Sequence, residues 1–198
     1  MRNQRIEGGA VAKVLAIVLL LAITSSCDPV PCLHPLYTEN DVVEEPMLLG
    51  IWAEGGDAEK CLWIFEKPAQ GGGYTLTWRE RDSQQGQEFK IHLVRLGTSL
   101  FLDAIETDRH DHLLLPVHMF GRIWITPDEV QIRMLDDEWL KKAIEAGRVD
   151  LRHERTDEGI VLTAETRELQ NLAMVYAEDE EAFSVKVTLH RVELEPAR

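Results

Sequence analysis

The sequence predicts a mainly β protein, an antiparallel β-barrel that is closed or nearly closed, with about nine strands and two short helices. Three observations predict this fold class. Apolar and polar residues alternate with a period of two through most of the chain after residue 47, as in strands with one buried face. These runs follow one another at short spacing and are too many for one twisted open sheet. Two other segments repeat apolar residues at helical spacing.

The strand runs are separated by Gly, Asp and Ser clusters, which favour turns. The expected strands cover 48–53, 62–66, 74–79, 89–94, 99–103, 114–126, 130–134, 159–163 and 183–190. The glycine run 71–73 lies between two of them and lacks the Lys-Ser/Thr pair of a phosphate-binding loop. We therefore interpret it as a turn.

The two helices carry their own start and stop signals. In the first, Asp136, Asp137 and Glu138 supply a cap and first-turn carboxylates, and Gly147 stands where the helix is expected to end. In the second, Thr166 is the expected N-cap of a segment whose apolar residues recur every three to four positions. Each helix has one apolar stripe, so each is expected to pack against the barrel wall or plug one end.

Residues 1–26 differ from the rest of the chain. A basic head containing Arg2, Arg5 and Lys13 precedes an apolar run over 14–23, and small polar residues then lead into Cys27. This is the layout of a secretory signal. The apolar run falls short of the roughly 20 residues that a membrane-spanning helix needs. The sequence therefore predicts a signal peptide over 1–26.

The cysteine that follows this segment resembles the lipobox of bacterial lipoproteins. That family prefers Leu, Val or Ile three residues before the cysteine, where this chain has Thr24 with Ile23 one step further out. The resemblance implies a diacylglyceryl group on the Cys27 thiol, of the kind that carries palmitate. It also implies a protein anchored in the cell membrane or outer membrane with its domain outside the cytoplasm. Ordinary secretory cleavage near Ser26, or an uncleaved anchor, are the alternatives.

The mature chain divides into a lead-in and a folded domain. Residues 27–46 contain four prolines and an acidic group, which predicts a Pro-rich acidic tether or an irregular lead-in. Residues 47–198 are expected to form the barrel-like domain. Cys32 and Cys61 are the remaining cysteines, in a compartment where disulfides persist. Either they pair across a loop of about 30 residues, or Cys61 is a buried thiol at the start of a strand and Cys32 is free.

Gly50-Ile51-Trp52 lies on the first expected strand of the domain. It resembles the Gly-x-Trp of lipocalin-like barrels, in which the Trp packs across the closed end and a C-terminal Arg lies over it. The family's Thr-Asp-Tyr stretch is absent from this chain. Arg191 is loosely placed to be the C-terminal arginine that lies over the Trp. The resemblance implies structural roles for Gly50 and Trp52, and we expect Trp52 to be buried at one end of the barrel.

Charge excludes one class of partner. The chain has a net charge of −14, and no basic patch with interleaved aromatic residues is present in it. Phosphate backbones repel such a chain, so we expect no nucleic-acid binding.

Two groups of residues are candidate binding sites. His110 and His112 are spaced to project from one face of a strand, which suits a metal such as zinc, although a charged run between strands is usually a turn. His118 shares a face with Arg122 and Trp124 on alternation. If that face turns inward, these three residues are candidates for a ligand site inside the barrel.

No familiar catalytic motif and no cofactor motif occurs in the sequence. We therefore expect a non-enzymatic, lipid-anchored module of the cell envelope that binds a small apolar or amphipathic molecule in its barrel. The alternative is an envelope protein with a filled barrel that contacts another protein. A metal-dependent enzyme using His110 and His112 is the third hypothesis.

Overall fold

Eight antiparallel strands close into a barrel in the computed structural model, which describes residues 29–55, 61–80, 83, 85–107, 115–157 and 159–192. The barrel strands are β2 (Gly50–Glu54), β3 (Cys61–Glu66), β4 (Tyr74–Glu80), β5 (Gln87–Leu96), β6 (Ser99–Glu106), β7 (His118–Ile125), β8 (Glu129–Met134) and β11 (Val185–Arg191). The predicted fold class is confirmed.

A ninth strand adds to the barrel without being part of its wall. The order is β5-β4-β3-β2-β11-β8-β7-β6, and β6 returns to pair with β5. β5 is long enough for two partners on one edge, because β4 pairs with residues 87–91 and β1 (Val42–Val43) pairs with Leu93 and Val94. The closed ring contains eight of the described strands. The run expected at 159–163 is not a barrel strand, because residues 160–162 pair with residues 153–155 in a separate two-stranded sheet, and β1 was not predicted.

Side chains that alternate inward along the strands fill the barrel. The largest buried ones include Trp52, Phe65 and Tyr74, and a short 3-10 turn, η1 (Pro46–Leu48), adds Leu48 at one end. Such alternation, with each second residue buried, is what a pleated strand with one face on a core requires. The remaining buried members of this core are Leu76, Ile91, Leu93, Leu102, Ala104, Ile123, Val130, Ile132, Met134 and Leu189.

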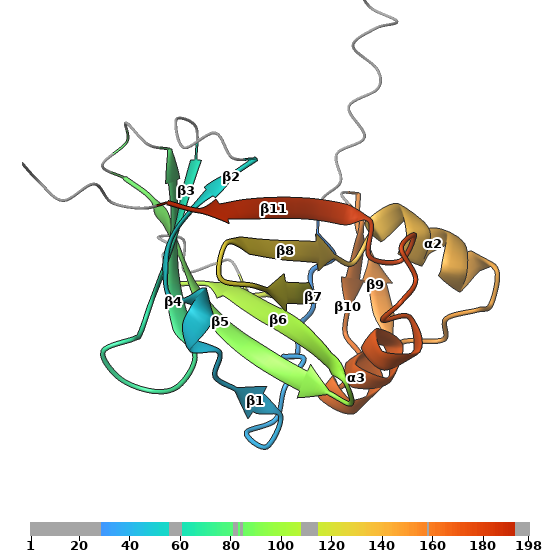
Figure 1. The fold of residues 1–198 in the computed structure, drawn as a ribbon. Coiled ribbons are helices and arrows are strands. Elements are labelled where there is room, and N and C mark those ends of the chain that lie inside the picture. The colour runs from blue at the N-terminus through green and yellow to red at the C-terminus, as the bar shows by residue number, and fades with distance from the viewer. Residues whose placement is uncertain are drawn as a thin grey trace, which may run out of the picture.

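A second hydrophobic core lies outside the barrel wall. Outward-facing Phe101 on β6 and Phe120 on β7 pack with apolar residues of α2 (Asp137–Glu145) and α3 (Thr166–Val175). The hairpin of β9 (His153–Arg155) and β10 (Ile160–Leu162) belongs to the same layer. Figure 1 shows these helices and strands gathered on one side of the barrel. The middle strands of the wall are therefore buried on both faces.

The Pro-rich segment is part of this second core, at least from residue 29 onward. Val30, Cys32 and Leu36 are buried in it, and Cys32 forms bridges to both His118 and Leu162. The tether expected over 27–46 is therefore packed into the fold at 30–37 and paired with β5 at Val42 and Val43, although residues 38–40 are exposed. Prolines and acidic residues suggested an open chain, but the apolar residues between them fill the space between barrel wall and helices.

Both predicted helices are present, with one difference at a cap. The side chain of Asp136 accepts a hydrogen bond from the Trp139 amide, as an N-cap does. The cap of α3 is Glu165, which forms a reciprocal capping box with Glu168, and Thr166 is the first helical residue. The Thr166 hydroxyl instead donates to the carbonyl of Pro35, so it fastens the N-terminal segment to α3.

None of the helices in the described ranges is long and apolar enough to span a membrane.

Candidate functional site

An apolar cavity of about 270 Å³ lies within the barrel. All the side chains that line it, each in the described part of the chain, are apolar except that of Gln87. Cavities with few polar groups and an apolar lining are the usual sites for small apolar ligands. The lining residues are Pro29, Trp63, Leu76, Trp78, Gln87, Phe89, Ile91, Leu102, Ala104, Met119, Ile132, Met134, Val185 and Val187.

Strand register explains which residues meet at this cavity. Trp52, Trp63 and Trp78 lie directly opposite one another on β2, β3 and β4, so their indoles form a row across the barrel. Trp52 is fully buried, whereas Trp63 and Trp78 are only partly buried and line the cavity. The Trp63 indole Nε1 is buried and has no hydrogen-bond partner among the described residues. A ligand that carries one acceptor group would satisfy it.

Trp52 closes the end of the barrel that lies away from the cavity. The Trp52 indole donates to the carbonyl of Leu48, and the Arg191 guanidinium lies over its ring. Gly50 makes this approach feasible, because a Cβ there would lie 2.8 Å from an Arg191 nitrogen and the backbone has a φ of +128°. The prediction that Trp52 is buried at one end of the barrel is confirmed.

The residues predicted to form an interior ligand site do not face the interior. On β7 the inward residue is Ile123, which belongs to the barrel core, so the face shared by His118, Arg122 and Trp124 turns outward. Both faces of β7 carry large apolar residues, and alternation alone could not say which face is inside. The expected interior site is therefore wrong for these three residues.

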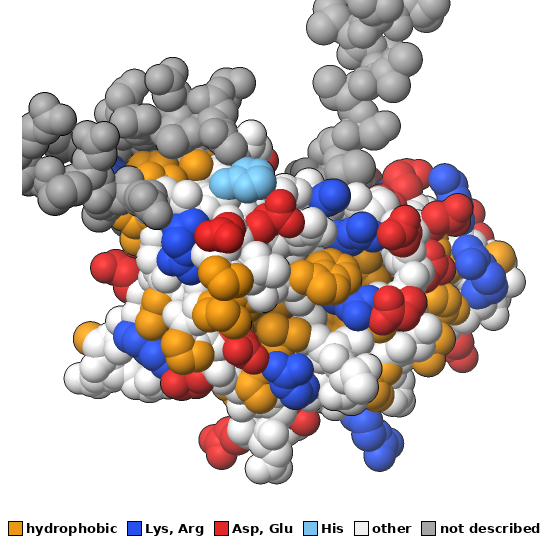
Figure 2. All heavy atoms as spheres, in the orientation of Figure 1, with side chains coloured by type: hydrophobic (Ala, Val, Ile, Leu, Met, Phe, Trp, Pro, Cys, Tyr) orange, Lys and Arg blue, Asp and Glu red, His pale blue; other side chains and the backbone are white. Residues whose placement is uncertain are grey.

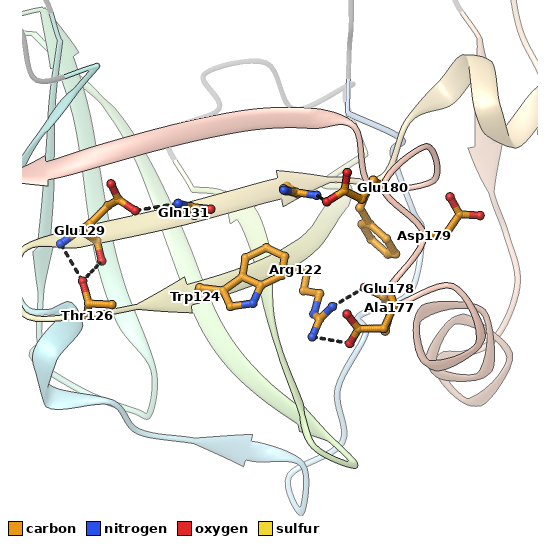
Figure 3. Close-up of a pocket in the computed structure, with 11 residues that line it drawn as sticks. Arg122, Trp124, Thr126, Glu129, Gln131, Ala177, Glu178, Asp179 and Glu180 are labelled. Carbon is orange, nitrogen blue, oxygen red and sulfur yellow. Dashed lines mark hydrogen bonds and ion pairs between the residues drawn. The ribbon is translucent and has the colours of Figure 1, made fainter.

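The structure also separates these three residues. Arg122 and Trp124 line a hollow of about 340 Å³ on the outer wall, and Figure 3 shows Arg122 reaching Ala177 and Glu178. His118 instead contacts Asp103, with its Nδ1 2.7 Å from the carboxylate.

Asp103 is the centre of a polar cluster under the N-terminal segment. It is completely buried, and its second carboxylate oxygen accepts a hydrogen bond from the Leu36 amide at 2.8 Å. His92, beside it on β5, packs against Tyr37 with the two rings tilted by 36° and their centroids 4.1 Å apart. The cluster ties residues 36–37 to the barrel wall, and a buried charge of this kind requires such partners.

Burial controls the protonation of the groups around Asp103. It lowers the pKa of His92 below its usual value, and Lys90 adds to this effect. Burial and the negative charge of Asp103 raise the pKa of Tyr37, and the same two causes raise the pKa of the Cys32 thiol. Cys32 is therefore an unreactive thiol in this environment.

Sequence reasoning missed Asp103 and His92. The signal was present, because Asp103 interrupts the apolar run 100–105 on β6 and His92 interrupts the apolar run 91–94 on β5. A single polar residue in such a run indicates either that its side chain faces outward from the barrel, or that it is buried and bonded to a polar partner. Here the face is outward from the barrel, but the second core covers it.

The remaining sequence candidates fall into two groups. Cys32 is a buried free thiol in the second core, so the Cys32–Cys61 disulfide is not formed. Cys27, His110 and His112 lie outside the described residues. Within the described ranges, no group of three or more His, Cys, Asp or Glu side chains is placed to hold a metal ion.

Fold and cavity define the class of protein. It is a small antiparallel β-barrel with an apolar interior cavity and a covering layer of helices on one outer face. No protein-family model matches the chain, and comparisons with curated proteins and with solved structures found no significant match.

Proposed function

We propose that this protein is a lipid-anchored module of the bacterial cell envelope whose barrel binds a small apolar or amphipathic molecule. The apolar cavity of about 270 Å³ is the observation that carries the proposal. A barrel of eight strands is close to the size at which side chains either fill the interior or leave room for one small ligand. The cavity favours the binding module over an envelope protein with a filled barrel.

The chemistry of the lining defines the ligand class. Trp63, Trp78 and Phe89 offer flat aromatic faces, and Met119 and Met134 offer flexible thioethers that adapt to irregular shapes. The amide of Gln87 and the unpaired indole N–H of Trp63 are the polar contacts for a single acceptor group. A ligand with an apolar body and one polar end fits this arrangement.

Binding is tested with N-phenyl-1-naphthylamine, a neutral apolar dye that is fluorescent in apolar surroundings. We expect saturable binding and energy transfer from Trp63 and Trp78. Ala104 lines the cavity, so Ala104→Phe should fill it and weaken dye binding at least about tenfold, which corresponds to about 1.4 kcal/mol. Ile105→Phe is the matched control, because the next residue on β6 points to the other face of the strand.

Dye binding that is unchanged by Ala104→Phe would show that the cavity is not the binding site. Native mass spectrometry of the protein purified from its own envelope would identify a retained ligand directly. A protein that carries no ligand and binds no apolar dye would contradict the proposal.

The anchor is tested separately. The thiol of Cys27 is the only group at that position that can accept a diacylglyceryl chain, so Cys27→Ser should abolish labelling by a tagged fatty acid and stop processing of the signal peptide. Continued labelling of this variant would contradict the lipoprotein assignment without affecting the proposal for the cavity.

A further inference from the structure

The outer face of the β7–β8 hairpin presents an exposed tryptophan. Trp124 has 37% of its surface accessible, and it points away from the barrel interior, unlike Ile123 and Ile125 on either side of it. Figure 2 shows apolar side chains in the middle of this face, bordered by basic and acidic ones. An exposed indole within a polar border is typical of a binding surface.

Two hollows adjoin this tryptophan. One, of about 340 Å³, is bordered by Gln131, Arg133 and the chain from Ala177 to Glu180. The other, of about 410 Å³, is bordered by Glu45, Arg95 and the turn from Thr98 to Leu100. Arg122, Trp124 and Thr126 line both of them. The two hollows therefore form one extended surface with Trp124 in the middle.

The Trp124 ring packs against two arginines. The guanidinium carbon of Arg122 lies 4.6 Å from the centroid of the Trp124 ring, and that of Arg133 lies 5.5 Å from it. Glu178 and Glu180 hold these two arginines at 2.7 and 3.0 Å. Fixing side chains in advance lowers the entropic cost of binding.

Charge excludes an anionic ligand. The carboxylates around the two hollows outnumber the guanidinium groups, since Glu45, Glu129, Glu178, Asp179 and Glu180 face Arg95, Arg122 and Arg133. Arg95, Arg122 and Arg133 are each already paired with a carboxylate. Purely apolar ligands are disfavoured as well, because they would bury these charged groups without hydrogen bonds.

We propose that this surface binds a neutral oligosaccharide chain, with one sugar ring stacked on Trp124 and its neighbours in the two hollows. Sugar hydroxyls donate to the surrounding carboxylates and accept from Gln131 and the guanidinium groups. The Nε atoms of Arg122 and Arg133 are buried and have no hydrogen-bond partner among the described residues. The site is separate from the barrel cavity.

The test is NMR titration of the full chain, with the indole N–H resonances as the readout and the backbone amide resonances of β7 and β8 as the readout in variants that lack Trp124. The probes are the neutral tetrasaccharides of cellulose, of N-acetylated chitin, of mannan and of amylose. We expect at least one of them to shift the Trp124 resonance saturably. Trp124→Ala should weaken that binding at least about tenfold, and Trp124→Tyr should retain most of it because an aromatic face remains.

Three controls make the result decisive. Met174→Ala removes a similarly exposed apolar side chain from α3 and should leave binding unchanged. Gln131→Ala removes a polar contact but leaves the Trp124 ring in place, and it should weaken binding several-fold. This variant tests the proposal even if Trp124→Ala does not fold. Ala104→Phe should not affect sugar binding, so this proposal and the proposal for the cavity fail independently.

The proposal is overturned if none of the four tetrasaccharides shifts the Trp124 resonance. It is also overturned if binding is unaffected by Trp124→Ala.

Discussion

The guanidinium of Arg191 lies 4.1 Å from the centroid of the Trp52 ring and donates hydrogen bonds to the carbonyls of Met47, Leu49 and Pro127. One side chain at the end of β11 thus joins the 3-10 turn, the start of β2 and the β7–β8 turn. The closed end of the barrel depends on this pair, and the first two predictions concern it.

Trp52→Ala should lower the free energy of unfolding by about 3 to 5 kcal/mol, the range for truncating a buried aromatic residue. Trp52 is fully buried and its indole donates to Leu48, so the substitution loses both packing and a hydrogen bond. Urea denaturation measures the loss. A change below about 1 kcal/mol would be incompatible with a core position.

Arg191→Met should cost about 2 kcal/mol, because it retains an apolar stem but leaves three carbonyl groups without their charged donor. Arg191→Lys should cost about half as much, since an ammonium can remain over the Trp52 ring but lacks the planar fork. Denaturation curves of the two variants give the comparison. Equal stability of Arg191→Met and wild type would show that the carbonyl contacts contribute nothing.

Asp103→Ala should destabilise the protein by about 3 kcal/mol. The substitution leaves the Leu36 amide and the His118 ring without their buried acceptor. Asp103→Asn keeps one acceptor oxygen of similar size and should cost less than half of this. Hydrogen exchange at Leu36 provides a local readout, and unchanged protection there in Asp103→Ala would contradict the assigned role.

The protein should lose stability as pH falls below about 6.5, the usual pKa of histidine. Burial depresses the pKa of His92 in the folded state, so the unfolded chain binds more protons in this range and is favoured. The contribution of neutral His92 to stability is thus fully present above pH 6.5, and it is lost as the pH falls toward the pKa of His92 in the folded state. Lys90 and His118 also lower this pKa, whereas Asp103 opposes the effect.

His92→Gln should flatten this part of the stability profile, measured by denaturation at several pH values. His118 is retained in both proteins, so the difference between the two profiles isolates His92. Identical slopes would assign the pH dependence to another group.

The alternation of apolar and polar residues was sufficient to predict a β-barrel. It was not sufficient to predict which face of each strand points into the barrel. In β4, Leu76 is buried while its neighbours Thr75 and Thr77 are less so, and the pattern has one interpretation. In β7, Phe120 and Ile123 are both buried, one in each core, and the pattern has two. The candidate site was misplaced for this reason.

The lead-in was misjudged for a related reason. Proline-rich composition predicts a chain without regular secondary structure, and it says nothing about whether that chain is covered. Leu36 is buried in the second core, and Gln170 of α3, far along the sequence, donates a hydrogen bond to its carbonyl, a contact that no local pattern contains. Asp103 was missed in the same way, since its partner Leu36 is distant in the chain.

The fixed position of Pro29 determines how near the fold would lie to a lipid on Cys27. Pro29 forms a bridge to Asp136 and also lines the barrel cavity. Two residues extend over about 7 Å at most. An acyl anchor on Cys27 would therefore hold the barrel cavity against the bilayer surface, and an apolar molecule would have almost no water to cross between the two.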